Sequence, residues 1–221
     1  MANFNYNPEI FRATEMEVSK TTTLTCEHPK DKIDPLKRWE CETPVIAEML
    51  IRELELKHGQ LVLDYGCGSG RLAKEFCKHD LRVIGVDIFP ELRDLAVKYV
   101  DAPDKFMAIS VGELEMLLAH GLKFDAGMCI WVLQHVPNPA EDIDRIFRAL
   151  RHPSYFVAGI NKTNRAVPVK ENNAWVDDGI SVPNELDKLF GLRRTIPYPT
   201  NLNINPDLFV FRSYMKTFSR N

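Results

Sequence analysis

The sequence predicts an α/β fold: a doubly wound, mostly parallel, seven-stranded sheet with helices on both faces and an antiparallel C-terminal hairpin. Two observations predict it. Between Gly59 and Ile160, short apolar segments alternate with segments whose apolar residues recur at helical spacing, which indicates a parallel sheet covered on both faces. After residue 190, two strand-like segments follow each other without a helix between them, as in an antiparallel hairpin at a sheet edge.

Seven short segments are expected to be strands, because each is rich in apolar residues and is bounded by polar or turn-forming residues. In chain order they are residues 61–65, 81–87, 105–110, 124–131, 154–160, 195–199 and 208–215. The helices expected between and after them are residues 70–77, 90–99, 113–119, 139–150 and 184–190. The helix at 139–150 shows the pattern most clearly, since Ile143, Ile146, Phe147 and Leu150 stand at i, i+3, i+4 and i+7.

One more helix is expected before the first strand, and its start is predicted at Pro44. Thr43 can act as the N-cap, and proline suits the first helical position because its φ is already helical and it lacks an N–H. Ile46, Met49 and Leu50 then mark a buried face, and Gly59 follows the helix end.

These elements also predict the domain organisation. Residues 1–42 are polar and weakly periodic, so we expect an N-terminal arm that partly folds over the core as a lid. Residues 43–221 are expected to form one domain, with a ligand-binding half at about 59–160 and a C-terminal part at about 161–221. The polar stretch 161–181 is expected to be a long loop.

Composition excludes several functional classes. The chain has 221 residues, of which 45% are hydrophobic, and this is enough for one sizeable α/β domain. A net charge of -3 gives no general attraction to nucleic acid, so none is expected as a partner. No apolar stretch approaches the roughly 20 residues of a membrane span, and the first ten residues lack the apolar region of a signal peptide. We therefore expect a cytoplasmic protein.

The cysteines support the same expectation. Their number is odd, and they form neither a Cys-x-x-Cys pair nor a compact cluster with histidine; they are Cys26, Cys41, Cys67, Cys77 and Cys129. Free thiols in a reducing compartment are therefore expected, and no metal site.

A glycine-rich turn follows the first predicted strand. Gly66, Gly68 and Gly70 lie in the segment Asp64-Tyr65-Gly66-Cys67-Gly68-Ser69-Gly70. Glycines permit positive φ and let a ligand approach the backbone closely, and the helix that follows presents free N–H groups. Such a turn alone is a weak signal, because it can also serve only to pack a helix against the sheet.

Asp87 strengthens the signal. It ends the second predicted strand, 21 residues after Gly66, and a carboxylate at about this spacing accepts hydrogen bonds from ribose hydroxyls in nucleotide-binding sheets. The alternative is a surface aspartate that caps the next helix. A dinucleotide is disfavoured, since the fingerprint needs G-x-G-x-x-G and here the third glycine comes one position early, before Arg71.

Together these residues resemble the class I, Rossmann-like family of S-adenosylmethionine-dependent methyltransferases. Residues 61–70 look like its first motif, a hydrophobic strand followed by (D/E)-x-G-x-G-x-G. Val86-Asp87 looks like its ribose-binding motif, and Val111-Gly112-Glu113 lies where the family often has an acidic residue near adenine. Residues 124–139, which contain Trp131-Val132-Leu133-Gln134-His135-Val136-Pro137, resemble its fourth-strand motif. The resemblance covers about residues 61–160.

The resemblance implies S-adenosylmethionine as cofactor and S-adenosylhomocysteine as product. It places Asp64 and the Ile130 carbonyl near the methionine ammonium, Asp87 at the ribose and Ile88 on adenine. The residues expected to contact the donor are Asp64, Gly66, Cys67, Gly68, Gly70, Asp87, Ile88, Glu113, Leu114, Ile130 and Trp131. Two readings of Glu113 stay open: it lies near the adenine amine, where the Leu114 backbone can substitute for it, or it caps its own helix.

Two residues of the arm, Arg38 and Trp39, precede the first helix where family members often fold a segment over the donor. Arg38 can bind the methionine carboxylate, because guanidinium binds carboxylates bidentately; the alternative is a solvated surface arginine. Trp39 is either an acceptor contact or only an anchor for the arm. His135, just beyond the fourth strand, is a candidate general base, with a structural histidine as the alternative. Further acceptor candidates are Trp131, Asn161, Trp175, Asp177 and Asp178.

The leading hypothesis is methyl transfer from S-adenosylmethionine to the oxygen or nitrogen of a small-molecule acceptor. A binding protein without turnover, acting as a partner subunit, is the competing class, and a nicotinamide oxidoreductase is a less favoured one. The sequence assigns neither the identity of the acceptor nor an oligomeric state.

Overall fold

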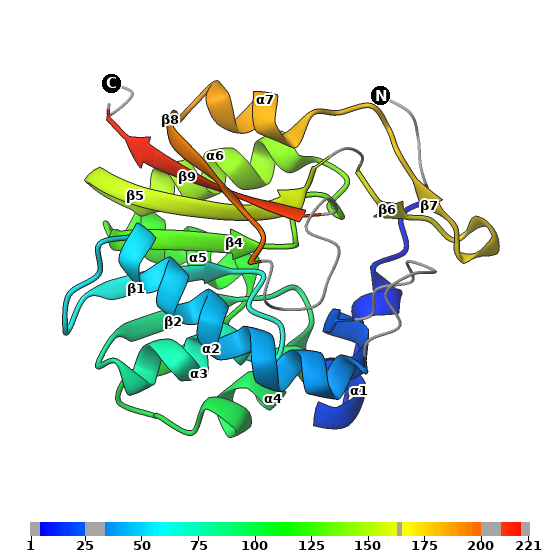
Figure 1. Cartoon of the computed structure of the whole chain (residues 1–221), viewed down its shortest axis with the longest axis horizontal. Helices are drawn as coiled ribbons and strands as arrows, with labels where there is room; N and C mark the ends of the chain where they lie inside the picture. The colour runs from blue at the N-terminus through cyan, green and yellow to red at the C-terminus, as the bar shows by residue number, and fades with distance from the viewer. Residues whose placement is uncertain (1–4, 25–33, 163–164, 200–208, 218–221) are drawn as a thin grey trace.

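The computed structural model describes residues 5–24, 34–162, 165–199 and 209–217 and confirms the predicted fold class. The main sheet consists of β1 (Leu61–Tyr65), β2 (Arg82–Val86), β3 (Phe106–Ile109), β4 (Phe124–Ile130), β5 (Leu150–Asn161), β8 (Gly191–Pro197) and β9 (Phe209–Lys216). Its strand order is β3-β2-β1-β4-β5-β9-β8 (Figure 1). The first five strands are parallel. The predicted C-terminal hairpin is confirmed, because β9 pairs antiparallel with both β5 and β8 at the sheet edge.

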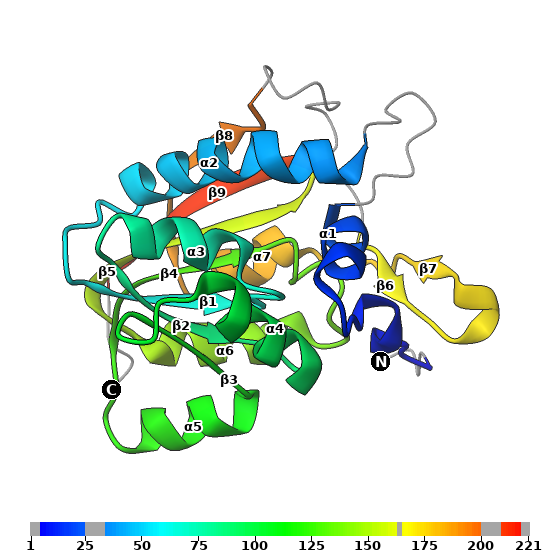
Figure 2. The same cartoon turned by 90° about the horizontal axis from the view of Figure 1, so that it is seen from below.

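Helices cover both faces of this sheet (Figure 2). One layer is α2 (Pro35–Glu53), α3 (Arg71–Lys78) and α4 (Pro90–Val100); the other is α5 (Val111–Ala119), α6 (Pro139–Ala149) and α7 (Val182–Asp187). Neighbouring residues of β1 show why the strand sequences are apolar without alternation. Val62 packs with the α2–α4 layer and Leu63 with the α5–α7 layer, since successive side chains of a strand point to opposite faces. Within the described residues, no helix has the length and apolarity needed to cross a membrane.

The strand order reverses between β1 and β4. The chain leaves β1 through α3 to reach β2 on one side, and β4 later pairs with β1 on the other side. At such a reversal the connections diverge and leave a crevice beyond the carboxyl ends of the strands, where ligands of doubly wound sheets bind. Helix α1 (Met16–Leu24) and a small sheet of β6 (Val167–Pro168) and β7 (Trp175–Val176) lie at this end of the molecule (Figure 1).

The predicted start of α2 at Pro44 was wrong. The helix begins at Pro35, where the Asp34 side chain caps it by accepting from the Leu36 N–H at 3.0 Å, and Pro44 lies inside it. Its first two turns carry the polar residues Arg38 and Glu42 on the buried face. Because these two residues pair with each other inside the protein, the buried face is not apolar and hydrophobic spacing does not reveal it.

The stretch 161–181 is not a simple loop as predicted. It contains β6, β7 and the short 3-10 helix η2 (Glu171–Asn173). The pairing extends to the N-terminal arm, since Tyr6 forms an isolated bridge with Val169 and the Asn7 N–H donates to the Pro168 carbonyl at 2.9 Å. Strands of only two residues are too short to show a periodicity in the sequence. The Asn-rich turn expected before β9 lies outside the described residues.

Candidate functional site

The glycine turn is held at the reversal point by β2. The N–H groups of Gly66 and Cys67 both donate to the Val86 carbonyl, at 2.8 and 3.0 Å. Gly66, Gly68 and Gly70 all have positive φ, at +81°, +52° and +84°, a region that glycine enters without steric cost. The turn therefore depends on glycine at all three positions for its backbone conformation.

The three glycines differ in what surrounds them. A Cβ on Gly66 would lie 2.2 Å from the Val132 side chain, and one on Gly70 would lie 2.7 Å from the Val100 side chain. A Cβ on Gly68 would meet nothing within 4 Å among the described residues. The first and third glycines thus serve the packing of the protein itself, and the middle one faces open space.

Asp87 lies beside this open space. One carboxylate oxygen accepts from the Gly68 N–H and the other from the Phe89 N–H, both at 3.0 Å. Burial raises the pKa of Asp87, while these backbone N–H groups act in the opposite direction. A carboxylate offers about four acceptor positions, so acceptor capacity remains for ligand hydroxyls. The next side chain, Ile88, is 55% exposed and offers an apolar surface next to them.

Asp64 is buried in β1, next to the turn. Burial and the charge of Asp87 raise its pKa to about 7, and the nearby Arg71 lowers it. Such a carboxyl favours a cationic ligand group, because a positive charge would stabilise its ionised form.

Glu113 performs the capping role that sequence analysis held open. Its carboxylate accepts from the N–H and the hydroxyl of Ser110, both at 2.7 Å, while the Ser110 hydroxyl accepts from the Glu113 N–H. These contacts hold the pKa of Glu113 below its usual value. The Leu114 side chain is fully buried, and its N–H donates to the Ser110 carbonyl at 3.0 Å. That amide is therefore engaged within the helix, and a backbone contact of Leu114 with the ligand stays a prediction.

The end of β4 carries an unusual residue. Ile130 is the last residue of the strand, and Trp131 follows with a φ of +60°, which is rare for a bulky residue and typical of functional sites. The Trp131 N–H donates to the Gly159 carbonyl at 2.8 Å. Its indole packs against the rings of Tyr198 and Phe209, and its buried ring N–H has no partner among the described residues.

Two buried arginines lie over this indole, and sequence analysis assigned a role to only one of them. Arg38 lies 5.8 Å and Arg71 5.2 Å from the ring centre. Arg38 is 4% exposed and its side chain donates to Glu42, so the solvated-surface reading of Arg38 was wrong. Arg71 directly follows the glycine turn. This position next to the turn could have indicated a ligand contact, but from the sequence Arg71 served only to argue against a dinucleotide.

Trp39 lies among the same residues as an internal anchor. It is 4% exposed, and its indole N–H donates to the Tyr99 hydroxyl at 3.2 Å. The arm also reaches the glycine turn directly, because the buried hydroxyl of Ser19 in α1 donates to that of Ser69 at 2.7 Å. Sequence analysis missed this contact, which joins residues far apart in the chain.

His135 has both ring nitrogens engaged. Nδ1 lies 2.6 Å from the Ala166 carbonyl oxygen and therefore donates to it, which leaves Nε2 to accept from the Gln134 amide at 3.2 Å. Burial and the charge of Arg165 lower the pKa of His135 to about 4, although the Ala166 carbonyl acts in the opposite direction. This geometry fits a structural histidine better than a general base, whose pKa should lie near the working pH.

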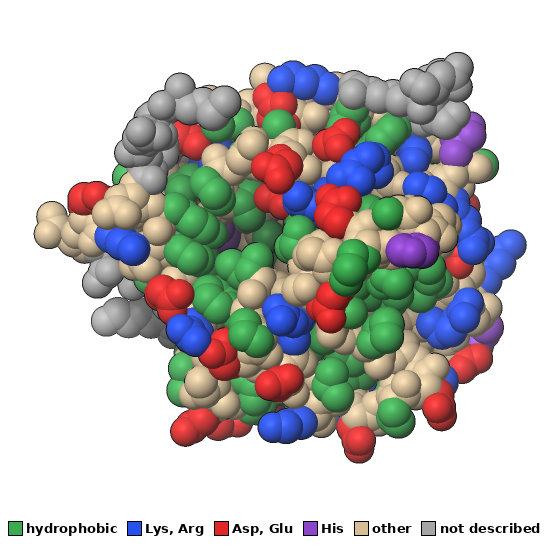
Figure 3. All heavy atoms as spheres, turned by 180° about the vertical axis from the view of Figure 1, so that it is seen from behind, with side chains coloured by type: hydrophobic (Ala, Val, Ile, Leu, Met, Phe, Trp, Pro, Cys, Tyr) green, Lys and Arg blue, Asp and Glu red, His purple; other side chains and the backbone are tan. Residues whose placement is uncertain are grey.

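The His135 ring also connects three segments. Its centre lies 5.1 Å from that of Phe11 in the arm and 5.4 Å from that of Trp175 in β7. Trp175 is 48% exposed. On the face shown in Figure 3, apolar side chains gather around a hollow beside the part of the molecule formed by β6 and β7.

A cavity of about 170 Å³ opens at the carboxyl ends of β4 and β5. Its lining includes Gln134, Asn161, Arg165, Asp177, Ile180 and Pro183. The Arg165 guanidinium donates to both carboxylate oxygens of Asp178, at 2.7 and 2.9 Å, so this arginine is neutralised. The Gln134 side-chain carbonyl is buried and has no partner among the described residues. Of the acceptor candidates predicted from sequence, Asn161 and Asp177 line this cavity and Asp178 pairs with its Arg165, whereas Gln134 and Arg165 were not predicted.

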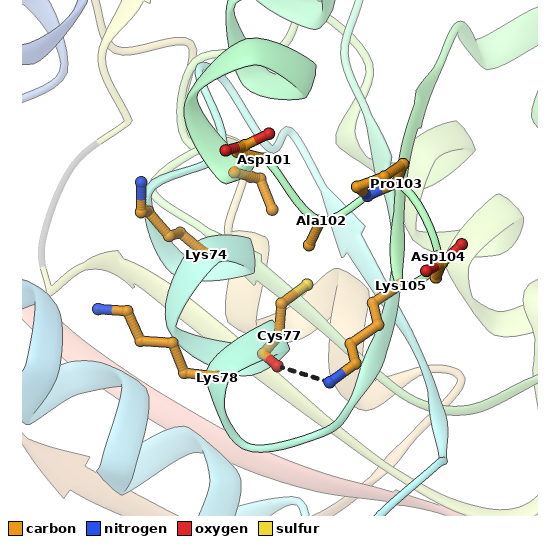
Figure 4. A pocket seen from close by; sticks show the side chains of 9 residues that line it. Lys74, Cys77, Lys78, Asp101, Ala102, Pro103, Asp104 and Lys105 are labelled. Atoms are coloured by element: carbon orange, nitrogen blue, oxygen red, sulfur yellow. Dashed lines mark hydrogen bonds between the residues drawn. The ribbon is translucent and has the colours of Figure 1, made fainter.

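A larger hollow of about 250 Å³ lies elsewhere, between α3 and the segment that connects α4 to β3 (Figure 4). Lys74, Cys77 and Lys105 line it. It is at the amino-terminal end of β3, away from the strand ends where doubly wound sheets bind ligands. Within the described residues, no three His, Cys, Asp or Glu side chains gather as metal ligands would.

Comparisons with known proteins agree with this geometry. A methyltransferase-domain model matches residues 63–158. The ubiquinone biosynthesis O-methyltransferase of Coxiella burnetii is 31% identical over 154 residues, which are 68% of this chain but only 64% of that protein. The chain thus matches less than two thirds of that relative's length.

Solved structures extend the similarity to the fold. The Burkholderia thailandensis 1,6-didemethyltoxoflavin-N1-methyltransferase superposes with a TM-score of 0.61 at 21% identity, covering 81% of this chain and 80% of that one. The cyclase SpnF superposes with a TM-score of 0.62 at 13% identity, covering 89% and 90%. A cyclase with this fold shows that the fold alone does not specify the reaction.

Proposed function

We propose that the chain is a class I, Rossmann-like S-adenosylmethionine-dependent methyltransferase and that it transfers a methyl group to a small-molecule acceptor; the matched methyltransferase-domain model and the 31% identical relatives support this. The observation that carries the proposal is the open face of Gly68, whose N–H donates to the carboxylate of Asp87. S-adenosylmethionine supplies a methyl group activated by its sulfonium. The relatives named for O-methylation support oxygen as the accepting atom, with nitrogen as the second possibility.

The residues around the turn fit this donor part by part. The acceptor capacity left on Asp87 suits ribose hydroxyls, and the exposed Ile88 suits the adenine face. Asp64, together with the Ile130 carbonyl, suits the methionine ammonium. Gly68 lets the ligand lie against the backbone. We assign the adenine edge to the side of Ser110 and Glu113, with the capping contact retained.

The acceptor is assigned to the cavity at the carboxyl ends of β4 and β5. Its charged wall is balanced by the Arg165–Asp178 pair, and the Gln134 carbonyl is a buried acceptor without a partner among the described residues. A buried carbonyl without a partner costs about 1–3 kcal/mol, which an acceptor bearing a hydroxyl or N–H group would recover. We therefore infer a small neutral acceptor that donates a hydrogen bond to Gln134. Asn161, which also lines this cavity, is a further contact of this proposal.

Binding and transfer are tested separately. Calorimetry with S-adenosylhomocysteine and with NAD tests the donor site: we expect binding of the first and none of the second. Absence of S-adenosylhomocysteine binding would refute the proposal. Asp87→Ala should weaken this binding at least tenfold, and Glu185→Ala, which removes a partly buried carboxylate of α7 that pairs with Lys188, is the control.

Transfer is then followed as S-adenosylhomocysteine formed from S-adenosylmethionine with a panel of small phenols, catechols and aromatic amines. Turnover with a neutral hydroxyl or amine compound is the expected result. Binding without turnover on any member would favour the competing hypothesis of a binding subunit.

We also place this activity in the cytoplasm. Cys41, Cys67, Cys77 and Cys129 are free thiols, as is usual in a reducing compartment. Cys26 lies outside the described residues. Mass spectrometry of the thiols after rapid alkylation in cells tests this assignment.

A further inference from the structure

We propose that Arg71 binds the carboxylate of the donor's methionine part, and that Arg71 and Asp64 together recognise its zwitterionic end. This inference rests on the donor site of the proposed function but not on the identity of the acceptor. Sequence analysis assigned the carboxylate to Arg38, and the contacts of the two arginines favour Arg71 instead.

Arg71 is a buried cation without a close anionic partner among the described residues. It is 5% exposed. Its nearest carboxylate oxygen, on Glu42, is 3.9 Å away, and its one hydrogen bond runs to the Thr43 hydroxyl at 3.5 Å. Buried charges are normally paired at shorter distance, so this guanidinium has donors left for an incoming anion.

Arg38, in contrast, has its own partner. Its guanidinium donates directly to the other carboxylate oxygen of Glu42, and both residues are buried. Arg38 and Glu42 cancel each other's charge, so the positive charge of Arg71 is the one in excess.

Asp64 is the corresponding buried group of negative charge. Burial lowers the pKa of Arg71 to about 10 and raises that of Asp64 to about 7. Each group is thus disfavoured in its charged form, and the attraction between the two reduces this only in part. A ligand with a carboxylate and an ammonium would stabilise both charged forms at once.

Two indole rings orient the Arg71 group. Its central carbon lies 5.7 Å from the Trp39 ring centre and 5.2 Å from that of Trp131. Guanidinium lies favourably over aromatic rings, and its N–H donors lie in its own plane rather than towards its faces. The rings therefore restrain the guanidinium and leave its donors for a carboxylate. Trp131 would contribute to donor binding through this contact.

The test compares two ligands that differ at this end. Calorimetry is done with S-adenosylhomocysteine and with 5′-deoxy-5′-methylthioadenosine, which lacks the carboxylate and the ammonium. For Arg71→Met we expect affinity for S-adenosylhomocysteine to fall about 10- to 100-fold, the usual effect of a lost charged hydrogen bond. Affinity for methylthioadenosine should change less than about threefold. Arg71→Lys should recover part of the loss, because it keeps the charge but not the planar fork.

Arg82→Met is the matched control, since Arg82 is an exposed arginine of β2 whose side chain donates to the Gly59 carbonyl. It should change neither affinity. Equal losses of both ligands in Arg71→Met would overturn the proposal, because they would indicate a structural role. An unchanged affinity for S-adenosylhomocysteine would overturn it as well. Failure of the wild-type protein to bind either ligand would instead refute the proposed donor site.

Discussion

Alanine at two glycines of the turn should separate folding from ligand binding. Gly66 and Gly68 are two residues apart and both have positive φ, but only Gly66 faces a side chain, that of Val132. We expect Gly66→Ala to destabilise the protein strongly. Gly68→Ala should leave most of the stability intact and reduce the affinity for the donor.

The magnitudes follow from the local geometry. A left-handed backbone conformation costs a non-glycine residue about 1–2 kcal/mol. Gly66→Ala adds a Cβ 2.2 Å from the Val132 Cγ2, and overpacking of this kind costs about 1–3 kcal/mol more. We therefore expect a loss of about 2–5 kcal/mol for Gly66→Ala and about 1–2 kcal/mol for Gly68→Ala. The first loss is a large part of the roughly 5–15 kcal/mol by which domains are stable.

Urea unfolding without ligand measures the first effect, and calorimetry with S-adenosylhomocysteine measures the second. Gly121→Ala is the control, since Gly121 also has positive φ, at +88°, and has no atom within 4 Å of its would-be Cβ among the described residues. It lies after α5, away from the site, so it should cost stability as Gly68→Ala does without affecting affinity. Equal unfolding midpoints for the Gly66 and Gly68 variants would refute the packing argument. Full affinity in Gly68→Ala would refute the assignment of its open side to the ligand.

Three further predictions concern the groups around the turn. Arg145 donates to the Tyr65 hydroxyl at 2.9 Å and to three carboxylates, so Arg145→Met should lower the free energy of unfolding by about 2–4 kcal/mol; a urea midpoint equal to that of the wild type would contradict this. Asp64 has a folded-state pKa of about 7, above its unfolded value near 3.9. Because the folded state binds this proton more tightly, the free energy of unfolding of the wild type, compared with that of Asp64→Asn, should fall as pH rises from about 4 to 7. Urea titrations across this range test the sign, and a wild-type free energy of unfolding that rises with pH relative to that of Asp64→Asn would contradict it. His135→Asn keeps a donor for the Ala166 carbonyl and should retain kcat within about threefold, whereas loss of a general base costs about 10²- to 10⁴-fold; initial rates with an active acceptor distinguish the two.

Spacing along the chain was sufficient for the parts of the site that lie near one another in sequence. The turn from Gly66 to Gly70 and Asp87 were predictable because both follow apolar strands, and parallel neighbours bring their carboxyl ends to one edge. The structure adds a direct contact between them, because the Gly68 N–H donates to the Asp87 carboxylate. The start of α2 was not predictable, because Arg38 and Glu42 on its buried face satisfy each other.

The sequence by itself determined the fold class and the location of the glycine turn, because these depend on local periodicity and on motifs of fixed spacing. Only the tertiary structure decided which glycine is open, that the ring nitrogens of His135 are already engaged, and that Arg38 has a partner while Arg71 lacks a close one. The physical reason is that burial and charge pairing are properties of contacts between distant segments. Val132 packs against Gly66, and Ala166 accepts from His135. No spacing in the chain encodes those distances.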